Sequence, residues 1–508
     1  MACRWGRLIA CQSLLAIASV LSGANSGAPL ADAAKEMDRA AIRTLLQRRV
    51  DVNAQQVDGA TALHWAAYND DLETAGQLIR AGANVKAANR YGVTPLSLAC
   101  TNGNGPMVDL LLKAGADPNA SLPGGETALM TAARTGKVEA INALLSRGAD
   151  VHAKESGSGQ NALMWAAAEG NAQAVEALIK AGADFQLRLN SGFTPLLIAA
   201  RDGQSGVVKA LLKAGANVNE TIQPGPPARK ATYVYDSEPS PKAGTSALGL
   251  AVVNGHFELA ATLLDAGADP NATLPGWTAL HAISWVRKPG VGDNDPAPQG
   301  SGSMTSLELA KKLVEKGANV NARMTKRVNV GLTRLNTLGA TPFFLAARTS
   351  DAVLMKTLVG LGADPLLPNA DNSTPLMAVA GLGTRSPGED AGTETEVLEA
   401  VKLALDLGAD PNAVDNNGET AMHGAAYKNL PAVVQFLSDN GAKIEVWNKT
   451  NKFGWTPLWI ADGHRFGNFK PSPDTIAVFR RIMTAAGASI AGIPTSAGGR
   501  NVDYKKQP

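Results

Sequence analysis

The sequence predicts an all-α repeat solenoid, and three observations support this prediction. A nine-residue phrase recurs along the chain, for example at residues 59–67, 92–100, 125–133 and 192–200. Several copies begin 33 or 34 residues apart, a spacing typical of stacked supersecondary units. Although 45% of the residues are hydrophobic, only 5% are aromatic and 52 are glycine, so we expect thin, closely packed layers rather than one bulky core.

The copies run in order along almost the whole chain. The phrase begins with glycine at positions 59, 92, 125, 159, 192, 244, 276, 339, 418 and 454, and with Asn372 in one further copy. Each unit closes with a second phrase, such as Gly-Ala-Asp-Pro-Asn at 115–119 and 408–412. This pattern resembles the ankyrin repeat family, which has a 33-residue period and a Thr-Pro-Leu-His-x-Ala signature. The resemblance covers roughly residues 29–490 and implies about eleven full repeats of two helices and a β-hairpin finger.

The elements of one unit follow from its residues. The Thr94 hydroxyl can cap a helix in which Pro95 occupies the first position, where a missing N–H costs nothing. Leu96, Ala99 and Cys100 then line one helical face. A second helix is predicted over 107–113, and Gly115 can end it in the left-handed conformation. Such a unit cannot bury its apolar face alone, so stability must come from stacking.

The first 28 residues have the three parts of a secretory signal peptide. Arg4 and Arg7 precede an apolar core at 14–21, and small residues follow. The core is too short to span a membrane, which takes about 20 apolar residues. Residues 8–11 resemble a lipoprotein box, which leaves open whether Cys11 is lipidated.

The remaining organisation follows from the repeat period. An N-terminal capping unit is predicted at 29–57, with Arg49 in place of the closing glycine, followed by regular repeats at 58–219. A finger insertion is predicted at 220–243. The repeats at 244–490 carry further insertions at 286–303, 323–338, 382–393 and 464–473, which can decorate a binding face or be tolerated surface loops. The tail at 491–508 is polar and is expected to be disordered.

Charge and motifs argue against several classes of function. Lys and Arg number 47 against 45 Asp and Glu, and this formal net charge of +2 does not indicate a nucleic-acid partner. Three cysteines cannot form a four-ligand zinc site, and nucleophile-elbow, phosphate-loop and zinc-protease motifs are absent from the sequence. We therefore expect a non-enzymatic protein without a cofactor or metal. His64, His281 and His423 share the fourth signature position, where the resemblance implies that the ring braces the finger.

The predicted function is protein binding through the concave face of the solenoid. In ankyrin proteins, partners contact the finger tips and the exposed end of the first helix. Transferred to this chain, the rule selects residues whose types are enriched in binding hot spots. They are Tyr68, Asn69, Tyr91, Arg134, Phe193, Arg201, Trp277, Trp285, Arg348, Tyr427, Lys428 and Trp455.

The sequence also gives expectations for the location of the protein, its oligomeric state and an alternative function. The signal and the disulfide-free array point to a bacterial protein of the cell envelope, periplasmic or secreted, and a monomer is expected. The protein partner stays unidentified. The alternative is an enzyme, or an accessory subunit of one, with an acidic site in the insertions around Asp293, Asp295, Glu389 and Asp390.

Overall fold

The computed structural model describes residues 27–224, 243–273, 275–289, 297–328, 333–467 and 470–488. Their contacts divide the chain into two compact units, which we name unit 1 (Met1–Asn217) and unit 2 (Val218–Pro508). The predicted tail at 491–508 and residues 1–26 of the predicted signal peptide, with Cys11, lie outside the described residues. No described helix combines the length and apolar character needed to cross a membrane.

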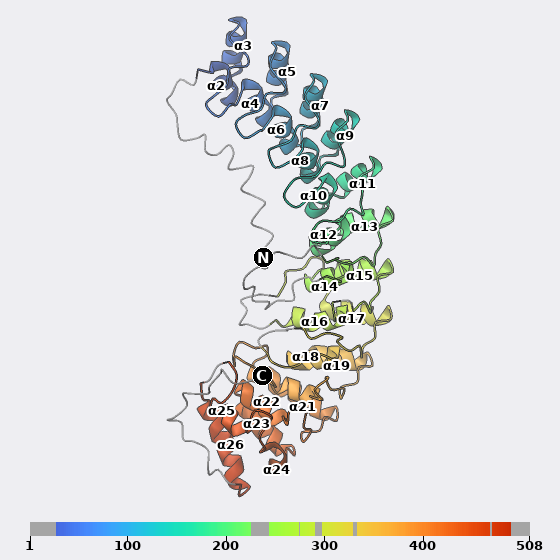
Figure 1. Ribbon diagram of the computed structural model, residues 1–508, viewed down its shortest axis with the longest axis vertical. Coiled ribbons are helices and arrows are strands. Elements are labelled where there is room, and N and C mark those ends of the chain that lie inside the picture. The colour runs from blue at the N-terminus through green and yellow to red at the C-terminus, as the bar shows by residue number, and fades with distance from the viewer. Residues whose placement is uncertain are drawn as a thin grey trace. The chain divides into compact units, whose positions relative to one another are not determined.

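Unit 1 is a stack of helix pairs. In Figure 1 the first helices of the pairs lie in one layer and the second helices in another, and each helix packs on its counterpart in the next pair. The pairs are α2 (Pro29–Lys35) and α3 (Arg39–Gln47), α4 (Ala62–Tyr68) and α5 (Leu72–Arg80), α6 (Pro95–Asn102) and α7 (Gly105–Lys113), α8 (Ala128–Thr135) and α9 (Val138–Ser146), α10 (Ala162–Glu169) and α11 (Ala172–Lys180), and α12 (Pro195–Arg201) and α13 (Ser205–Lys213).

Helix α6 illustrates why the repeated phrase folds in this way. The predicted cap is confirmed, because the Thr94 hydroxyl accepts a hydrogen bond from the Ser97 amide over 3.2 Å. The predicted apolar face is also confirmed, since Leu96, Ala99 and Cys100 are buried. Small side chains at this face allow neighbouring first helices to pack closely.

Asparagines of the closing phrase connect successive repeats. Asn119 donates to the Gly148 carbonyl over 3.0 Å and accepts from the Asp150 amide over 2.7 Å. In unit 2, Asn412 makes the same pair of bonds to Gly441 and Lys443. The asparagine therefore fixes the spacing between one repeat and the next.

The fingers are the turns between a closing phrase and the next first helix. Within one finger, the Asn89 amide donates to the Val93 carbonyl over 3.0 Å, and between fingers the Arg90 amide donates to the Asp58 carbonyl over 2.9 Å. With so few bonds per finger, the described residues contain isolated β-bridges and no strand. The predicted brace is confirmed at His64, whose Nδ1 lies 2.9 Å from the Thr61 hydroxyl and whose Nε2 lies 3.0 Å from the Val93 carbonyl.

Unit 2 is also built of two layers of helices. Its first helices are α14 (Ala247–Val253), α16 (Ala279–Arg287), α18 (Pro342–Arg348), α20 (Pro375–Val379), α22 (Ala421–Lys428) and α25 (Pro457–Ala461). Its second helices are α15 (Phe257–Asp265), α17 (Ser306–Glu315), α19 (Ala352–Gly360), α21 (Glu394–Asp406), α23 (Pro431–Asp439) and α26 (Pro473–Ala485), and the short α24 (Ile444–Trp447) follows α23. Helix α16 extends to Arg287, so the segment predicted as an insertion at 286–303 begins inside a helix.

Candidate functional site

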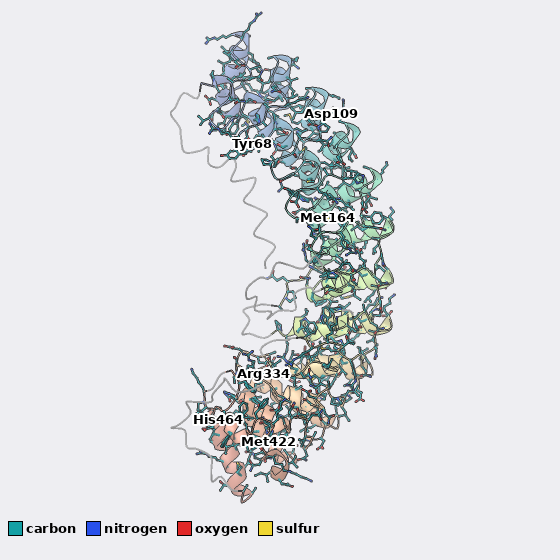
Figure 2. The ribbon with its side chains drawn as sticks, viewed as in Figure 1. Tyr68, Asp109, Met164, Arg334, Met422 and His464 are labelled. Atoms are coloured by element: carbon teal, nitrogen blue, oxygen red, sulfur yellow. The ribbon has the colours of Figure 1, made fainter. Side chains whose placement is uncertain are left out.

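The predicted binding residues of unit 1 lie on its fingers and first helices. Tyr68 and Tyr91 are each 44% exposed. Figure 2 shows Tyr68 and Asp109 on opposite sides of the unit, with Tyr68 at the end of a first helix and Asp109 on a second helix. Asn69 is half-buried, because its side chain donates to the carbonyls of Ala34 and Lys35 in the preceding pair.

Three more predicted residues of unit 1 are held by aromatic stacking. Arg201 is half-buried, lies over the Phe193 ring at 5.3 Å and pairs with Asp202 over 2.8 Å. Arg134 lies over the Trp165 ring at 5.8 Å. These contacts restrict the long arginine side chains and leave parts of them in solvent.

Four predicted residues of unit 2 are buried, and the expectation that they are exposed is wrong. Trp277, Arg348, Tyr427 and Lys428 have exposed fractions of 3% to 5%. Trp277 packs against the half-buried Trp285, with ring centroids 5.5 Å apart. Arg348 and Lys428 are covered by an insertion that both contact, and the Tyr427 hydroxyl donates to the buried Glu419.

That insertion is the segment 382–393. Arg348 pairs with Asp390 over 2.8 Å, and the Thr384 hydroxyl donates to the same carboxylate over 3.0 Å. Lys428 donates to the carbonyl of Ala391. Burial lowers the pKa of Lys428 to about 8.

The acidic residues of the alternative hypothesis do not converge in the described part of the chain. Asp293 and Asp295 lie outside the described residues. Glu389 is exposed, and Asp390 is buried in its ion pair with Arg348. Within the described residues, groups of three or more His, Cys, Asp or Glu side chains able to hold a metal are not found.

A cavity of about 420 Å³ does lie among the insertions of unit 2, and we name it the finger cavity. Residues of three insertions line it together with the fingers of three successive repeats. The insertions contribute Arg327, Arg334, Leu335, Asn336, Leu382, Gly383, Thr384 and Phe466, and the fingers and α22 contribute Asp371, Ser373, Asp415, Asn417, Glu419, Tyr427, Lys452 and Phe453.

Two glycines bring the insertions into contact. A Cβ atom at Gly383 would lie 2.6 Å from the Leu335 nitrogen, and one at Gly467 would lie 2.2 Å from the Arg385 oxygen. Both glycines also have positive φ, 78° and 84°, which favours glycine. The Arg334 amide donates to the Gly383 carbonyl over 2.8 Å. The segment 382–393 thus contacts both of the other insertions.

The floor of the finger cavity is acidic. The buried Glu419 accepts hydrogen bonds at Oε1 from the Tyr427 hydroxyl and the Asn451 amide group, each over 2.8 Å. Burial, with a smaller effect of the Asp415 charge, raises the pKa of Glu419 to about 7. The Asp415 carboxylate already has hydrogen-bond donors, since it accepts from the amides of residues 417 and 419 and from the Ser373 hydroxyl.

The rim of the finger cavity is basic and aromatic. The Arg334 guanidinium lies 3.6 Å from the Phe466 ring centroid, so the insertions at 323–338 and 464–473 meet there, near the position of Arg334 in Figure 2. Lys452 lies 5.1 Å from the Phe453 ring. The predicted residue Trp455 is half-buried and packs against Phe466, with centroids 4.9 Å apart.

The insertions that form the walls of this cavity were predicted from the sequence, but its floor was not. The predicted carboxylates lie within the insertions, whereas Asp415 and Glu419 belong to a regular finger. One signal was available: the finger that carries them stands in the chain between the insertions at 382–393 and 464–473.

Two family models match the chain. One, described as ankyrin repeats in three copies, matches residues 30–122, 63–155, 129–222 and 392–467, which together exceed half of the chain. The other, described as ankyrin repeat, matches residues 243–273. Between residues 274 and 391, which these matches leave out, the helix pairs of unit 2 continue.

Similar curated proteins share short segments with the chain. Protein fem-1 homolog A of Rattus norvegicus is 38% identical over 61 residues, 12% of this chain and 9% of that protein. Putative ankyrin repeat protein FPV219 of fowlpox virus is 46% identical over 50 residues, 10% of this chain and 12% of that protein. Glycerophosphocholine phosphodiesterase GDE1 of Candida albicans is 26% identical over 128 residues, 25% of this chain and 10% of that protein. The chain thus spans about a tenth of the length of these relatives.

Proposed function

Because the chain belongs to the ankyrin repeat family, we propose that it is a non-enzymatic scaffold that binds a protein through the face formed by its fingers and first helices. Ankyrin repeats are protein–protein interaction modules, and the family is generally non-enzymatic. The finger and first-helix face is the concave face of an ankyrin solenoid. The observation that carries the proposal is the 44% exposure of both Tyr68 and Tyr91 on this face of unit 1.

Side chains that are already held in place favour the same face as the binding surface. Arg134 and Arg201 are stacked on aromatic rings before any partner arrives, so binding costs them less side-chain entropy. Tyrosine and arginine are also the types that dominate binding hot spots. These residues make unit 1 the part of the chain that we assign to the partner.

The location belongs to the same proposal. The signal peptide proposed at residues 1–28 would export the chain to the cell envelope of a bacterium, where it would act as a periplasmic or secreted monomer. With a net charge of +2, a protein partner fits better than a nucleic acid. Glu389 and Asp390 do not form an acidic enzyme site together, because Glu389 is exposed and Asp390 is paired with Arg348.

The proposal is tested by affinity capture from an envelope fraction with a matched control. The test variant carries Tyr68→Ala, Arg134→Ala and Arg201→Ala. The control carries Asp109→Ala, Lys113→Ala and Lys180→Ala on second helices, where Asp109 is half-buried and the two lysines are exposed. A partner retained by the wild type and the control, but reduced at least about tenfold on the folded test variant, supports the proposal. Equal retention by both variants contradicts it.

A further inference from the structure

The finger cavity of unit 2 separates charge in a way that protein binding at unit 1 does not explain. Three carboxylates, on Asp371, Asp415 and Glu419, line it together with three cations, on Arg327, Arg334 and Lys452. Asp415 and Glu419 are buried, whereas the three cations are exposed. In the described part of the chain, none of the three carboxylates forms an ion pair. The buried carboxyl groups of Asp415 and Glu419 therefore form the floor, the exposed cations lie at the mouth, and Asp371 is half-buried.

Glu419 is arranged to receive a donor from inside the cavity. Its Oε1 is fixed by Tyr427 and Asn451, while Oε2 accepts no hydrogen bond from any described residue. Oε2 is not fully enclosed by protein atoms, so it retains access to the cavity that Glu419 lines. A carboxylate oxygen that opens into the cavity can accept from a ligand, and a ligand cation is the group that would stabilise its ionised form most.

The mouth is suited to an anionic group beside an apolar stem. Arg334 and Lys452 each lie over an aromatic ring, Phe466 and Phe453, which directs these side chains along the cavity wall. The Lys452 ammonium donates to the Asn417 side chain over 2.6 Å, and this bond places the charge on a finger that lines the cavity. Guanidinium and ammonium groups placed in this way recognise carboxylates.

The size of the finger cavity limits the ligand. A volume of about 420 Å³ is near the lower end of ligand pockets, which span roughly 300–1,000 Å³. A purely anionic ligand would face the buried carboxylates, and a purely cationic one would leave the basic mouth unused. We propose that the finger cavity binds a small zwitterion, a basic amino acid or a dipeptide that ends in one, with its cationic side chain on Glu419 and its carboxylate on Arg327, Arg334 and Lys452.

The raised pKa of Glu419 fits this ligand. Without a ligand, burial and the Asp415 charge keep Glu419 partly protonated near neutral pH, while Tyr427 and Asn451 donate to the ionised form and Lys452 favours it. A cation at Oε2 favours the ionised form more strongly, so binding near pH 7 releases a proton. This release distinguishes a ligand that reaches the floor from one that stays at the mouth.

The experiment is isothermal titration of the full-length protein with five probes. L-arginine, L-lysine and glycyl-L-arginine carry both charges, agmatine lacks the carboxylate, and L-citrulline has a neutral group in place of the guanidinium. We expect at least one of the first three to bind at one site per chain, and agmatine and citrulline to bind at least about tenfold more weakly than arginine. Absence of binding by all three zwitterions overturns the proposal, as does equal affinity for arginine, agmatine and citrulline.

Two variants and one control assign the ends of the ligand. Glu419→Gln keeps an oxygen that can accept from Tyr427. It should weaken the binding of arginine at least about tenfold and have little effect on the binding of citrulline. Lys452→Gln changes an exposed side chain and should weaken the binding of arginine more than the binding of agmatine. Glu389→Gln changes an exposed carboxylate that does not line the cavity and should leave every affinity unchanged. Unchanged arginine affinity in both test variants overturns the assignment.

Discussion

The Tyr427 hydroxyl donates a hydrogen bond to Oε1 of Glu419 over 2.8 Å, and this pair joins a finger to the end of a first helix. The two positions come one and nine residues after the leading glycine of their repeat. The same positions hold Phe193 and Arg201 in unit 1, where the guanidinium lies 5.3 Å from the ring. A side chain on the finger and one on the first helix therefore meet on the same face in both units.

The Glu419→Gln substitution should change how stability depends on pH. The folded pKa is about 7 and the ordinary value is 4.5, so between these pH values the folded state holds a proton that the unfolded state has lost. This glutamate therefore lowers stability as pH rises from 4.5 to 7. We expect the variant to gain up to about 3 kcal/mol relative to the wild type over this range, measured by urea unfolding at pH 4.5 and 7. A pH-independent difference between the two proteins would contradict the assigned burial.

Two buried histidines should produce the opposite pH dependence. Burial lowers the pKa of His281 and of His423 to about 4, so both stay neutral in the folded state while the unfolded state takes up protons below pH 6.5. Stability should fall by up to about 2 kcal/mol per histidine between pH 6.5 and 5. His281→Gln should remove one such contribution in urea unfolding, whereas substitution of the exposed His152 should leave the slope unchanged.

Alanine at Gly467 should separate two insertions of unit 2. Its Cβ would lie 2.2 Å from the Arg385 oxygen, and its φ of 84° is already unfavourable for alanine. Gly388 is the matched control, because its φ is 88° and nothing lies within 4 Å of an added Cβ. We expect Gly388→Ala to cost roughly 1–2 kcal/mol and Gly467→Ala at least about 1 kcal/mol more. Equal losses in urea unfolding would show that the two insertions do not touch.

The asparagine link between repeats should be measurable at Asn119. Its alanine variant loses the bonds to Gly148 and Asp150, so we expect a loss of about 1–2 kcal/mol in the free energy of unfolding. Asn142 is exposed on α9, and its side chain makes no hydrogen bond to any described residue. Asn142→Ala should therefore change stability by less than about 0.5 kcal/mol, and a similar loss in both variants would argue against the link.

Much of the fold could be predicted because its determinants are local. The cap at Thr94, the buried face around Cys100 and the brace at His64 all depend on residues within one repeat or its neighbour. The same local rule was wrong for Arg348 and Tyr427, which share their repeat position with Tyr68 and Arg201. The burial of Arg348 depends on its ion pair with Asp390 of an insertion, and Tyr427 is buried against Glu419 and Asn451 of two successive fingers.

The contacts between insertions around the finger cavity could not be predicted from the repeat period of the sequence. The segment 382–393 touches the segment 323–338 at Gly383 and the segment 464–473 through Gly467, and nothing in the repeated phrase encodes either contact. The insertions could be located as breaks in the period. Their convergence over Glu419 required the three-dimensional arrangement.

Site-specific photocrosslinking in the native envelope would test most directly whether a partner binds the finger and first-helix face. A photoreactive phenylalanine derivative would replace Tyr68, Tyr91 or, as the control on a second helix, Asp109. We expect one adduct of the same mass at positions 68 and 91 and none at 109. An adduct at position 109 alone, or equal adducts at all three positions, would contradict it.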